Sequence, residues 1–240
     1  REWLDGSQFD GGMKYLFTAP TIAFTAGDRV DIEQVKDRSY QPYPALSAAG
    51  YAEKIQEVLQ LYPWEIQLTQ LNLLASHDTA RLLTIAGGDK ETVTLSTLLL
   101  LTFPGAPSIY YGDEVGLPGA IDPDSRRGFP VEANWDKELL KTHQELIAIR
   151  HAYPCLRTGE YKVLFAKGEV YVFARILDEQ ELIVGINVST TDAKVNVDIS
   201  NLKSLPNKLL YASDKVELKN QDSQISLNIP SRSGCIISEQ

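Results

Sequence analysis

A histidine and an aspartate stand side by side at the end of an apolar segment, in the stretch LLASHDTAR at residues 73–81. His77 and Asp78 could form an ionisable site at the mouth of that segment. Asp78 could instead cap a helix by accepting backbone N–H bonds from Ala80 or Arg81. The dipeptide alone leaves both uses open, so the rest of the chain must decide between them.

A metal-dependent His-Asp site would need further histidines, and the chain has two more, His143 and His151. His143 falls among leucines and isoleucines of an expected helix, which favours a core or boundary position. His151 falls at the end of the same helix, where the dipole favours a cation. Cys155 and Cys235 lie far apart without CxxC spacing, and we expect two small buried or semi-buried thiols. These patterns predict no metal centre.

A second pair of ionisable residues, Asp113 and Glu114, follows the stretch PSIYYG. Paired carboxylates could do acid/base work, or they could bond backbone groups and arginines and so fix the shape of a loop. Arg126 and Arg127, in the stretch DPDSRR, have the right sign and lie nearby in the chain. We therefore favour a structural role for the two carboxylates, with these arginines as partners.

The charge and composition exclude several classes of partner. The formal net charge is -9, which repels phosphate backbones and anionic lipid surfaces, so we expect neither nucleic acid nor a membrane as partner. The longest apolar run, at residues 92–103, is shorter than the roughly 20 residues that span a bilayer. The opening residues REWLDGSQFD lack the pattern of a signal peptide and are typical of the middle of a protein.

Hydrophobic periodicity predicts alternating strands and helices up to about residue 154. The expected elements are a strand leading into a helix at 12–24, a helix from Ser47 to Pro63, a buried strand at 70–75, a helix from an N-cap at Asp89 to Pro104, a buried strand at 107–111, and a helix from an N-cap at Asp136 to Pro154. Polar residues follow each strand, and residues 116–134 form a long loop. This pattern predicts a parallel α/β sheet or barrel whose function lies at the strand C-termini.

The pattern changes near residue 159 to short alternating strands separated by turns. Seven such strands are expected in the remaining residues, which is typical of an antiparallel sandwich. We place the boundary between Pro154 and Gly159. The predicted domains are thus residues 1–156, an α/β part, and residues 157–240, an all-β antiparallel sandwich.

Several stretches, in this order, resemble the α-amylase family of glycoside hydrolases, and most closely its neopullulanase, cyclomaltodextrinase and maltogenic amylase branch. They are SQFDGGMKYLF at 7–17, YPWEIQLTQLNLLASHDTAR at 62–81, FPGAPSIYYGDEVGLPG at 103–119 and DPDSRRGFP at 122–130. The resemblance extends through the C-terminal β domain. It implies that residues 1–156 are the C-terminal part of a (β/α)8 TIM barrel, about strands 6 to 8.

The resemblance also implies roles for the residues singled out above. In that family an Asp nucleophile follows the fourth barrel strand, a Glu acid/base the fifth and a third carboxylate the seventh. LLASHDTAR resembles the seventh-strand element, so Asp78 is the expected third carboxylate, His77 the neighbouring sugar-binding histidine and Arg81 the arginine that follows the pair. The nucleophile and the acid would lie upstream of this chain. We interpret Glu2 as a surface residue, and Lys14 replaces the asparagine usual in this branch.

The implied role of Asp78 has a physical basis. A retaining glycosidase uses a nucleophilic carboxylate and a protonated one, about 5 to 5.5 Å apart. A third carboxylate can bond the sugar hydroxyls more strongly as the ring flattens, and its charge raises the pKa of the acid. Such binding acts on the transition state.

The expected function is that of a fragment of a retaining α-glucan hydrolase acting on malto-oligosaccharides, cyclodextrins or related glucans. Asp78 would stabilise the transition state, His77 would bind substrate, and five residues would support them: Arg81, Asp113, Glu114, Arg126 and Arg127. We expect no cofactor, an inactive isolated chain, pairing with the missing N-terminal half of the barrel or with itself, and a cytoplasmic location. The alternatives are a non-catalytic amylase-like sugar-binding or interaction module and an α-glucan transglycosidase.

Overall fold

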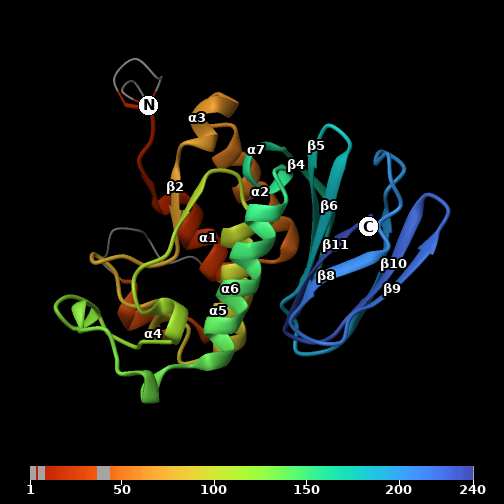
Figure 1. The fold of residues 1–240 in the computed structure, drawn as a ribbon. Helices are drawn as coiled ribbons and strands as arrows, with labels where there is room; N and C mark the ends of the chain where they lie inside the picture. Colours follow the sequence, from red (N-terminus) through yellow and green to blue (C-terminus); the bar gives the residue numbers. More distant parts are fainter. Residues whose placement is uncertain (1–3, 5–8, 37–43, 240) are drawn as a thin grey trace.

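The computed structural model describes residues 4, 9–36 and 44–239, so the interpretation of Glu2 lies outside the described residues. An α/β part is followed along the chain by an all-β part, at the right in Figure 1. The elements of the α/β part are β1 (Met13–Lys14), α1 (Tyr15–Ala26), α2 (Ala48–Leu59), α3 (Trp64–Leu68), β2 (Leu71–Leu73), α4 (Leu82–Ile85), α5 (Lys90–Thr102), β3 (Ala106–Ser108), α6 (Lys137–Ala152) and α7 (Cys155–Thr158). Single 3-10 turns lie at Gly27–Arg29, Ile32–Gln34, Asp113–Val115, Asp124–Arg126 and Glu132–Asn134.

The strands β1, β2 and β3 form a parallel sheet in that order. Met13 lies opposite Leu71, and Leu71 opposite Ala106. Parallel neighbours need long crossovers, which here contain the helices α1 to α3 and then α4 and α5. β3 is shorter than the predicted strand at 107–111 and only half-buried, because it has a neighbour on one side alone among the described residues. Tyr110 and Tyr111 therefore lie beyond the strand.

The two predicted N-cap residues, Asp136 and Asp89, form different hydrogen bonds. Asp136 accepts N–H bonds from Glu138 and Leu139, both at 3.1 Å, which confirms the predicted N-cap of α6. Asp89 does occupy the N-cap position of α5, but its carboxylate makes no cap hydrogen bond. It accepts instead from the Thr92 hydroxyl, at 2.5 Å, and from an arginine of the all-β part.

The all-β part is a sandwich of two antiparallel sheets. Its strands are β4 (Glu160–Lys167), β5 (Val170–Leu177), β6 (Gln180–Asn187), β7 (Ala193–Asp198), β8 (Lys208–Ala212), β9 (Glu217–Gln221), β10 (Gln224–Ile229) and β11 (Ser233–Ser238). One sheet has the order β4-β5-β6-β11-β8 and the other β7-β10-β9. The expectation of seven strands was wrong by one, because β9 has the sequence ELKNQ and lacks apolar alternation. It is an edge strand with a largely exposed surface, so it needs none.

The five-stranded sheet is buried on both faces. Along β5, Tyr171 and Phe173 join the core of the α/β part, whereas Val170 and Val172 join the core between the two sheets. This alternation follows from the period of two along a strand. The helices α1, α2, α5 and α6 lie between the parallel sheet and this sandwich (Figure 1). One hydrophobic core therefore crosses from the first part of the chain to the second.

Two buried arginines join the parts at α7. Arg175 is fully buried and donates to the carbonyls of Thr102, Leu156 (2.9 Å) and Gly159 (2.8 Å). Arg150 donates to carbonyls at the end of α5, among them Leu101 at 2.8 Å, and also to Leu156, at 2.8 Å. Burial lowers the pKa of Arg175 to about 9 and that of Arg150 to about 10. The guanidinium groups thus satisfy the last carbonyls of α5, where the helix dipole favours cations.

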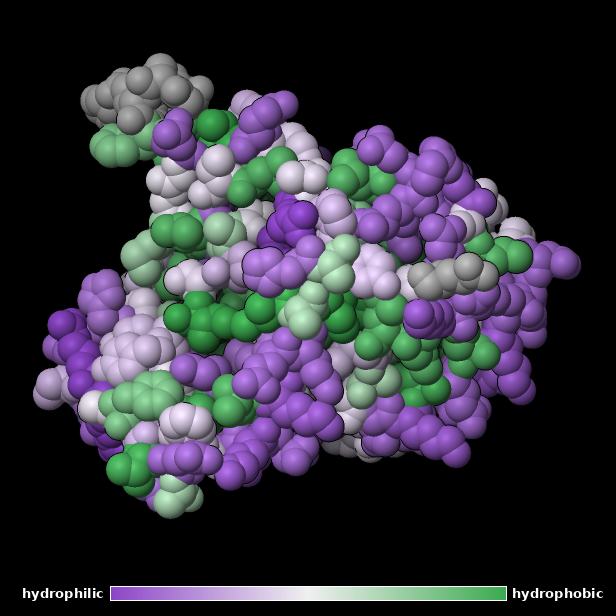
Figure 2. Space-filling model, in the orientation of Figure 1, coloured by the Kyte–Doolittle hydropathy of each residue, from purple (hydrophilic) through white to green (hydrophobic). Residues whose placement is uncertain are grey.

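Some apolar side chains of the parallel sheet and of the first turn of α1 face outward. Met13, Leu16 and Leu71 are between 43% and 55% exposed. A hydrophobic band crosses the middle of the face drawn in Figure 2, whereas the right-hand end, over the sandwich, is mostly hydrophilic.

No helix among the described residues is long and apolar enough to cross a membrane. The predicted buried thiols are confirmed, since Cys155 and Cys235 are both free and buried.

Candidate active site

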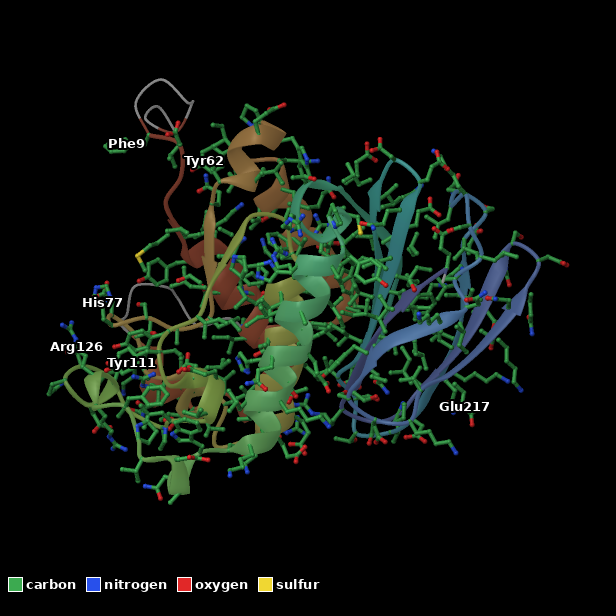
Figure 3. All side chains as sticks on the ribbon, viewed as in Figure 1. Phe9, Tyr62, His77, Tyr111, Arg126 and Glu217 are labelled. Carbon is green, nitrogen blue, oxygen red and sulfur yellow. The ribbon has the colours of Figure 1, made fainter. Side chains whose placement is uncertain are left out.

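His77 and Asp78 lie just past the C-terminal end of β2, where the chain leaves the core. Leu74 and Ala75 are still buried, at 4% and 3% exposure. The side chains of His77 and Asp78 are 54% and 49% exposed, and His77 Nε2 lies 3.4 Å from Asp78 Oδ1. Figure 3 shows His77 on the same side of the molecule as Arg126 and Tyr111. The strand thus delivers an imidazole and a carboxylate to a solvent-facing edge of the parallel sheet.

The turn that carries the pair is closed by hydroxyl groups. Ser76 N–H donates to Thr79 Oγ1 at 2.9 Å, and Asp78 N–H donates to Ser76 Oγ at 3.1 Å. The alternative of a helix cap at Asp78 was wrong. The next helix, α4, has Arg81 at its N-cap position, and within the described residues Asp78 accepts no backbone bond from Ala80 or Arg81. The Asp78 carboxylate is therefore not used as a helix cap, and its side chain is 49% exposed.

Arg81 is the buried centre that connects the loops around the pair. Its guanidinium is fully buried and lies 4.2 and 4.6 Å from the ring centroids of Tyr110 and Tyr111. Nε donates to the Ser125 carbonyl at 2.9 Å, and Nη1 donates to Asp113 Oδ1 at 3.1 Å. Nη1 also donates to the carbonyl of Tyr111. One side chain from the β2 loop thus fixes both the β3 loop and the following long loop.

The predicted partners of Asp113 were wrong. The structure pairs Asp113 with Arg81, not with Arg126 or Arg127, because the C-terminal ends of neighbouring parallel strands meet at one edge of the sheet. Burial raises the pKa of Asp113 to about 7, the Arg81 charge and hydrogen bond oppose that rise, and the Glu114 charge adds to it. Asp113 therefore bonds an arginine, but a different one from the two that the sequence predicted.

Asp113 and His143 line one pocket, and Glu114 directly follows Asp113 in the chain. Glu114 has one carboxylate oxygen, Oε2, that is buried without a hydrogen-bond partner in the part of the chain that the structure describes. His143 is buried, with Nδ1 2.8 Å from the Leu139 carbonyl, and burial lowers its pKa. The core position predicted for His143 is confirmed. Across residues 4, 9–36 and 44–239, no group of three or more His, Cys, Asp or Glu could hold a metal ion.

Arg126 and Arg127 lie in the loop beside the pair, and only Arg126 reaches it. Arg126 Nε lies 2.7 Å from Asp122 Oδ1 and donates to the His77 carbonyl at 3.2 Å, while its Nη2 lies 4.0 Å from Asp78 Oδ1. Arg127 makes a two-pronged pair with Asp124, at 2.8 and 2.9 Å. His77, Asp78 and Arg126 thus gather at one exposed position with donors and an acceptor suited to hydroxyl groups.

Two tyrosines, Tyr111 and Tyr15, lie near His77 and Asp78, and the sequence patterns did not predict their contacts. Tyr111, which falls at the end of the predicted strand at 107–111, is 40% exposed and donates to the Arg127 carbonyl at 2.6 Å. Tyr15 was not considered, although its hydroxyl lies 2.8 Å from Ser76 Oγ. No local pattern in the sequence marks Tyr15, because its contact with Ser76 depends on the pairing of β1 with β2.

Comparison with known proteins decides the family. Residues 1–128 match the family described as "Alpha amylase, catalytic domain", and residues 159–237 match "Alpha-amylase C-terminal domain". The chain belongs to the α-amylase family. The resemblance seen in the sequence is thereby confirmed, and so is the coarse architecture of a catalytic-domain portion followed by a β domain.

The relatives of this α-amylase-family chain are glycoside hydrolases. A cyclomaltodextrinase of Geobacillus thermopakistaniensis (strain MAS1) is 37% identical over 202 residues, covering 82% of this chain and 31% of the relative. Neopullulanase 2 of Thermoactinomyces vulgaris is 31% identical over 240 residues, covering 98% of this chain and 38% of the relative. The solved debranching enzyme from Nostoc punctiforme has a TM-score of 0.94 and 67% identity, covering 99% of this chain and 49% of that chain. The chain thus spans about a third of these curated relatives and about half of the solved structure.

Proposed function

We propose that this chain is the C-terminal portion of a retaining α-glucan hydrolase, in which Asp78 is the third carboxylate of the active site. The observation that carries the proposal is the exposed, uncapped Asp78 carboxylate at the C-terminal end of β2, beside His77 and Arg126. Cyclomaltodextrinase and neopullulanase relatives support a substrate with α-glucosidic bonds between glucose units.

In this mechanism Asp78 accepts hydrogen bonds from sugar hydroxyls, and these bonds strengthen as the sugar ring flattens toward the oxocarbenium-like transition state. His77 contacts a neighbouring hydroxyl of the same sugar. Arg126 keeps the turn in place through the His77 carbonyl, and its outer N–H groups lie beside Asp78. Attack on the anomeric carbon and protonation of the leaving oxygen belong to two further carboxylates, which we assign to residues upstream of this chain.

The test uses the longer protein that contains these residues, assayed on cyclodextrin, maltotriose and pullulan. We expect Asp78→Asn to lower kcat by about 100-fold or more, because it removes a charge that acts in the transition state. Glu217→Gln is the control, since Glu217 lies on β9 at the far end of the molecule (Figure 3). Equal activity of the Asp78→Asn and Glu217→Gln proteins would overturn the assignment. Hydrolysis with inversion, followed by NMR of the released sugar, would overturn the retaining mechanism.

A further inference from the structure

The place of Asp78 in the turn depends on the side chain of Ser76. Asp78 N–H donates to Ser76 Oγ at 3.1 Å, and Thr79 N–H donates to the Ser76 carbonyl at 3.2 Å. Ser76 is 3% exposed, so water has little access to its hydroxyl. A rotation of the Ser76 side chain would remove the acceptor that holds the Asp78 amide. The orientation of one serine hydroxyl therefore sets the backbone that carries the carboxylate.

Among the residues that the structure describes, that hydroxyl has one partner outside its own turn. Tyr15 Oη lies 2.8 Å from Ser76 Oγ, and either oxygen can be the donor. A serine hydroxyl offers one proton and two lone pairs, and the Asp78 amide occupies one lone pair. The Tyr15 hydroxyl uses the proton or the second lone pair, and in either case it restricts the Ser76 rotamer.

Tyr15 is itself held by the fold. It is the first residue of α1 and directly follows β1, in which Lys14 lies opposite Asn72 of β2. Its ring packs against the core of the α/β part. The strand β1, which is paired with β2, thus leads directly into the tyrosine that contacts the turn after β2.

We propose that Tyr15 is a positioning residue for the reaction, acting through Ser76 to hold the Asp78 carboxylate where it meets the sugar. The proposal rests on the function proposed above for Asp78. Tyr15 need not touch the substrate, because the hydrogen-bond chain Tyr15–Ser76–Asp78 is enough. A displacement of about 1 Å in a catalytic group can cost up to about 100-fold in rate, so loss of one hydroxyl here has a kinetic effect.

The kinetic test compares Tyr15→Phe with Tyr161→Phe in the longer protein. Tyr161 is a matched control, because its hydroxyl lies 2.9 Å from that of Tyr171 in the core, away from the site. We expect Tyr15→Phe to lower kcat about tenfold or more with KM within about twofold, while Tyr161→Phe keeps kcat within about twofold. Similar melting temperatures would separate positioning from general destabilisation. A Tyr15→Phe protein with the kcat of the Tyr161→Phe protein would overturn the proposal.

Two further variants follow the chain of contacts. Ser76→Ala should lower kcat at least as much as Tyr15→Phe, and adding Tyr15→Phe to it should cause no further loss, because the tyrosine acts through the serine. Ser76→Thr keeps the hydroxyl and should retain most of the rate. An additive loss in the double variant would contradict the proposed route.

A measurement that does not depend on catalysis can test the role of Tyr15 separately from the proposed function of Asp78. Hydrogen exchange at the Asp78 amide should accelerate about tenfold in Tyr15→Phe and remain unchanged in Tyr161→Phe. If the exchange accelerates but Asp78→Asn leaves activity intact, the hydrogen-bond chain stands and the proposed function fails. If exchange at Asp78 is the same in both tyrosine variants, Tyr15 does not hold the turn.

Discussion

Nη2 of Arg232, in the turn that precedes β11, lies 2.5 Å from Oδ2 of Asp89 at the start of α5. The side chains of Arg232 and Asp89 are 10% and 18% exposed. Arg232 also donates to the Thr92 hydroxyl and to the Thr25 carbonyl, both at 2.6 Å. Its φ of 51° is rare for a residue other than glycine, so the contacts hold a backbone conformation that is costly by itself.

Breaking this pair should destabilise the fold. We expect Arg232→Ala and Asp89→Ala each to lower the free energy of unfolding by about 3 kcal/mol, because each removes the nearest ion-pair partner of a largely buried charge. The double variant should lose less than the two single losses together, and urea unfolding measures the difference. Arg29→Ala is the control, since Arg29 lies 3.7 Å from the same carboxylate but is 40% exposed. Strictly additive losses would contradict the pairing.

Asp113 should make stability fall as the pH rises. Its folded pKa, about 7, lies above the ordinary value of 3.8, so the native state binds this proton more tightly than the unfolded state between these values. The contribution is fully present below about pH 4 and is lost as the pH rises to 7. We expect Asp113→Asn to gain stability relative to the parent protein between pH 5 and pH 8. Urea titrations at the two pH values would show parallel changes if Asp113 is not responsible.

Lys14 should make the stability of the fold rise with pH in the alkaline range. Its ammonium is buried and donates to Gln67 Oε1, and burial lowers its pKa from 10.5 to about 8. The unfolded state binds more protons between pH 8 and 10.5, so stability should rise with pH in that window. Lys14→Met should lack this rise, and the two proteins should converge in stability from pH 7 to pH 10. A constant difference between them would show that Lys14 titrates normally.

The 240-residue chain should not hydrolyse glucans by itself. Asp78 can bind and polarise a sugar, but a retaining reaction needs a nucleophile and an acid, which we assign to upstream residues. Hydrolysis of maltotriose or a nitrophenyl maltoside should not exceed that of a His77→Ala, Asp78→Asn variant of the chain. Faster release of sugar or nitrophenol by the unaltered chain would refute this expectation.

Structural features that depend on interactions within a few residues could be predicted from local sequence patterns. The parallel strands that lead to His77 and Tyr111, the N-cap at Asp136 and the core position of His143 follow from hydrophobic spacing and capping chemistry within a few residues. The partner of Asp113 could not be predicted in this way. Arg126 is closer in the chain, but Arg81 is closer in space, because the parallel arrangement of β2 and β3 brings their ends together.

Strand β9 and the contact of Tyr15 were also not predicted from the sequence. The strand β9 carries polar residues on both faces, so no alternation marks it. Tyr15 resembled any apolar residue at a helix start, and only the register of β1 with β2 reveals that its hydroxyl meets Ser76. The roles of Asp78 and His77 in a reaction stay predictions, since they depend on groups that would come from upstream.

The five-stranded sheet with two buried faces limits how this chain could be recombined. Exchange of only the residues from β4 onward would replace Arg175, which bonds the Thr102 and Leu156 carbonyls, and also Tyr171 and Phe173, which pack against the α/β part. A β domain transplanted from a relative would have to bring a matching arginine and matching aromatic side chains. The unit that can be exchanged by gene shuffling therefore includes α5 and α6 together with the sandwich, and protease cleavage at the junction should leave two pieces that remain associated.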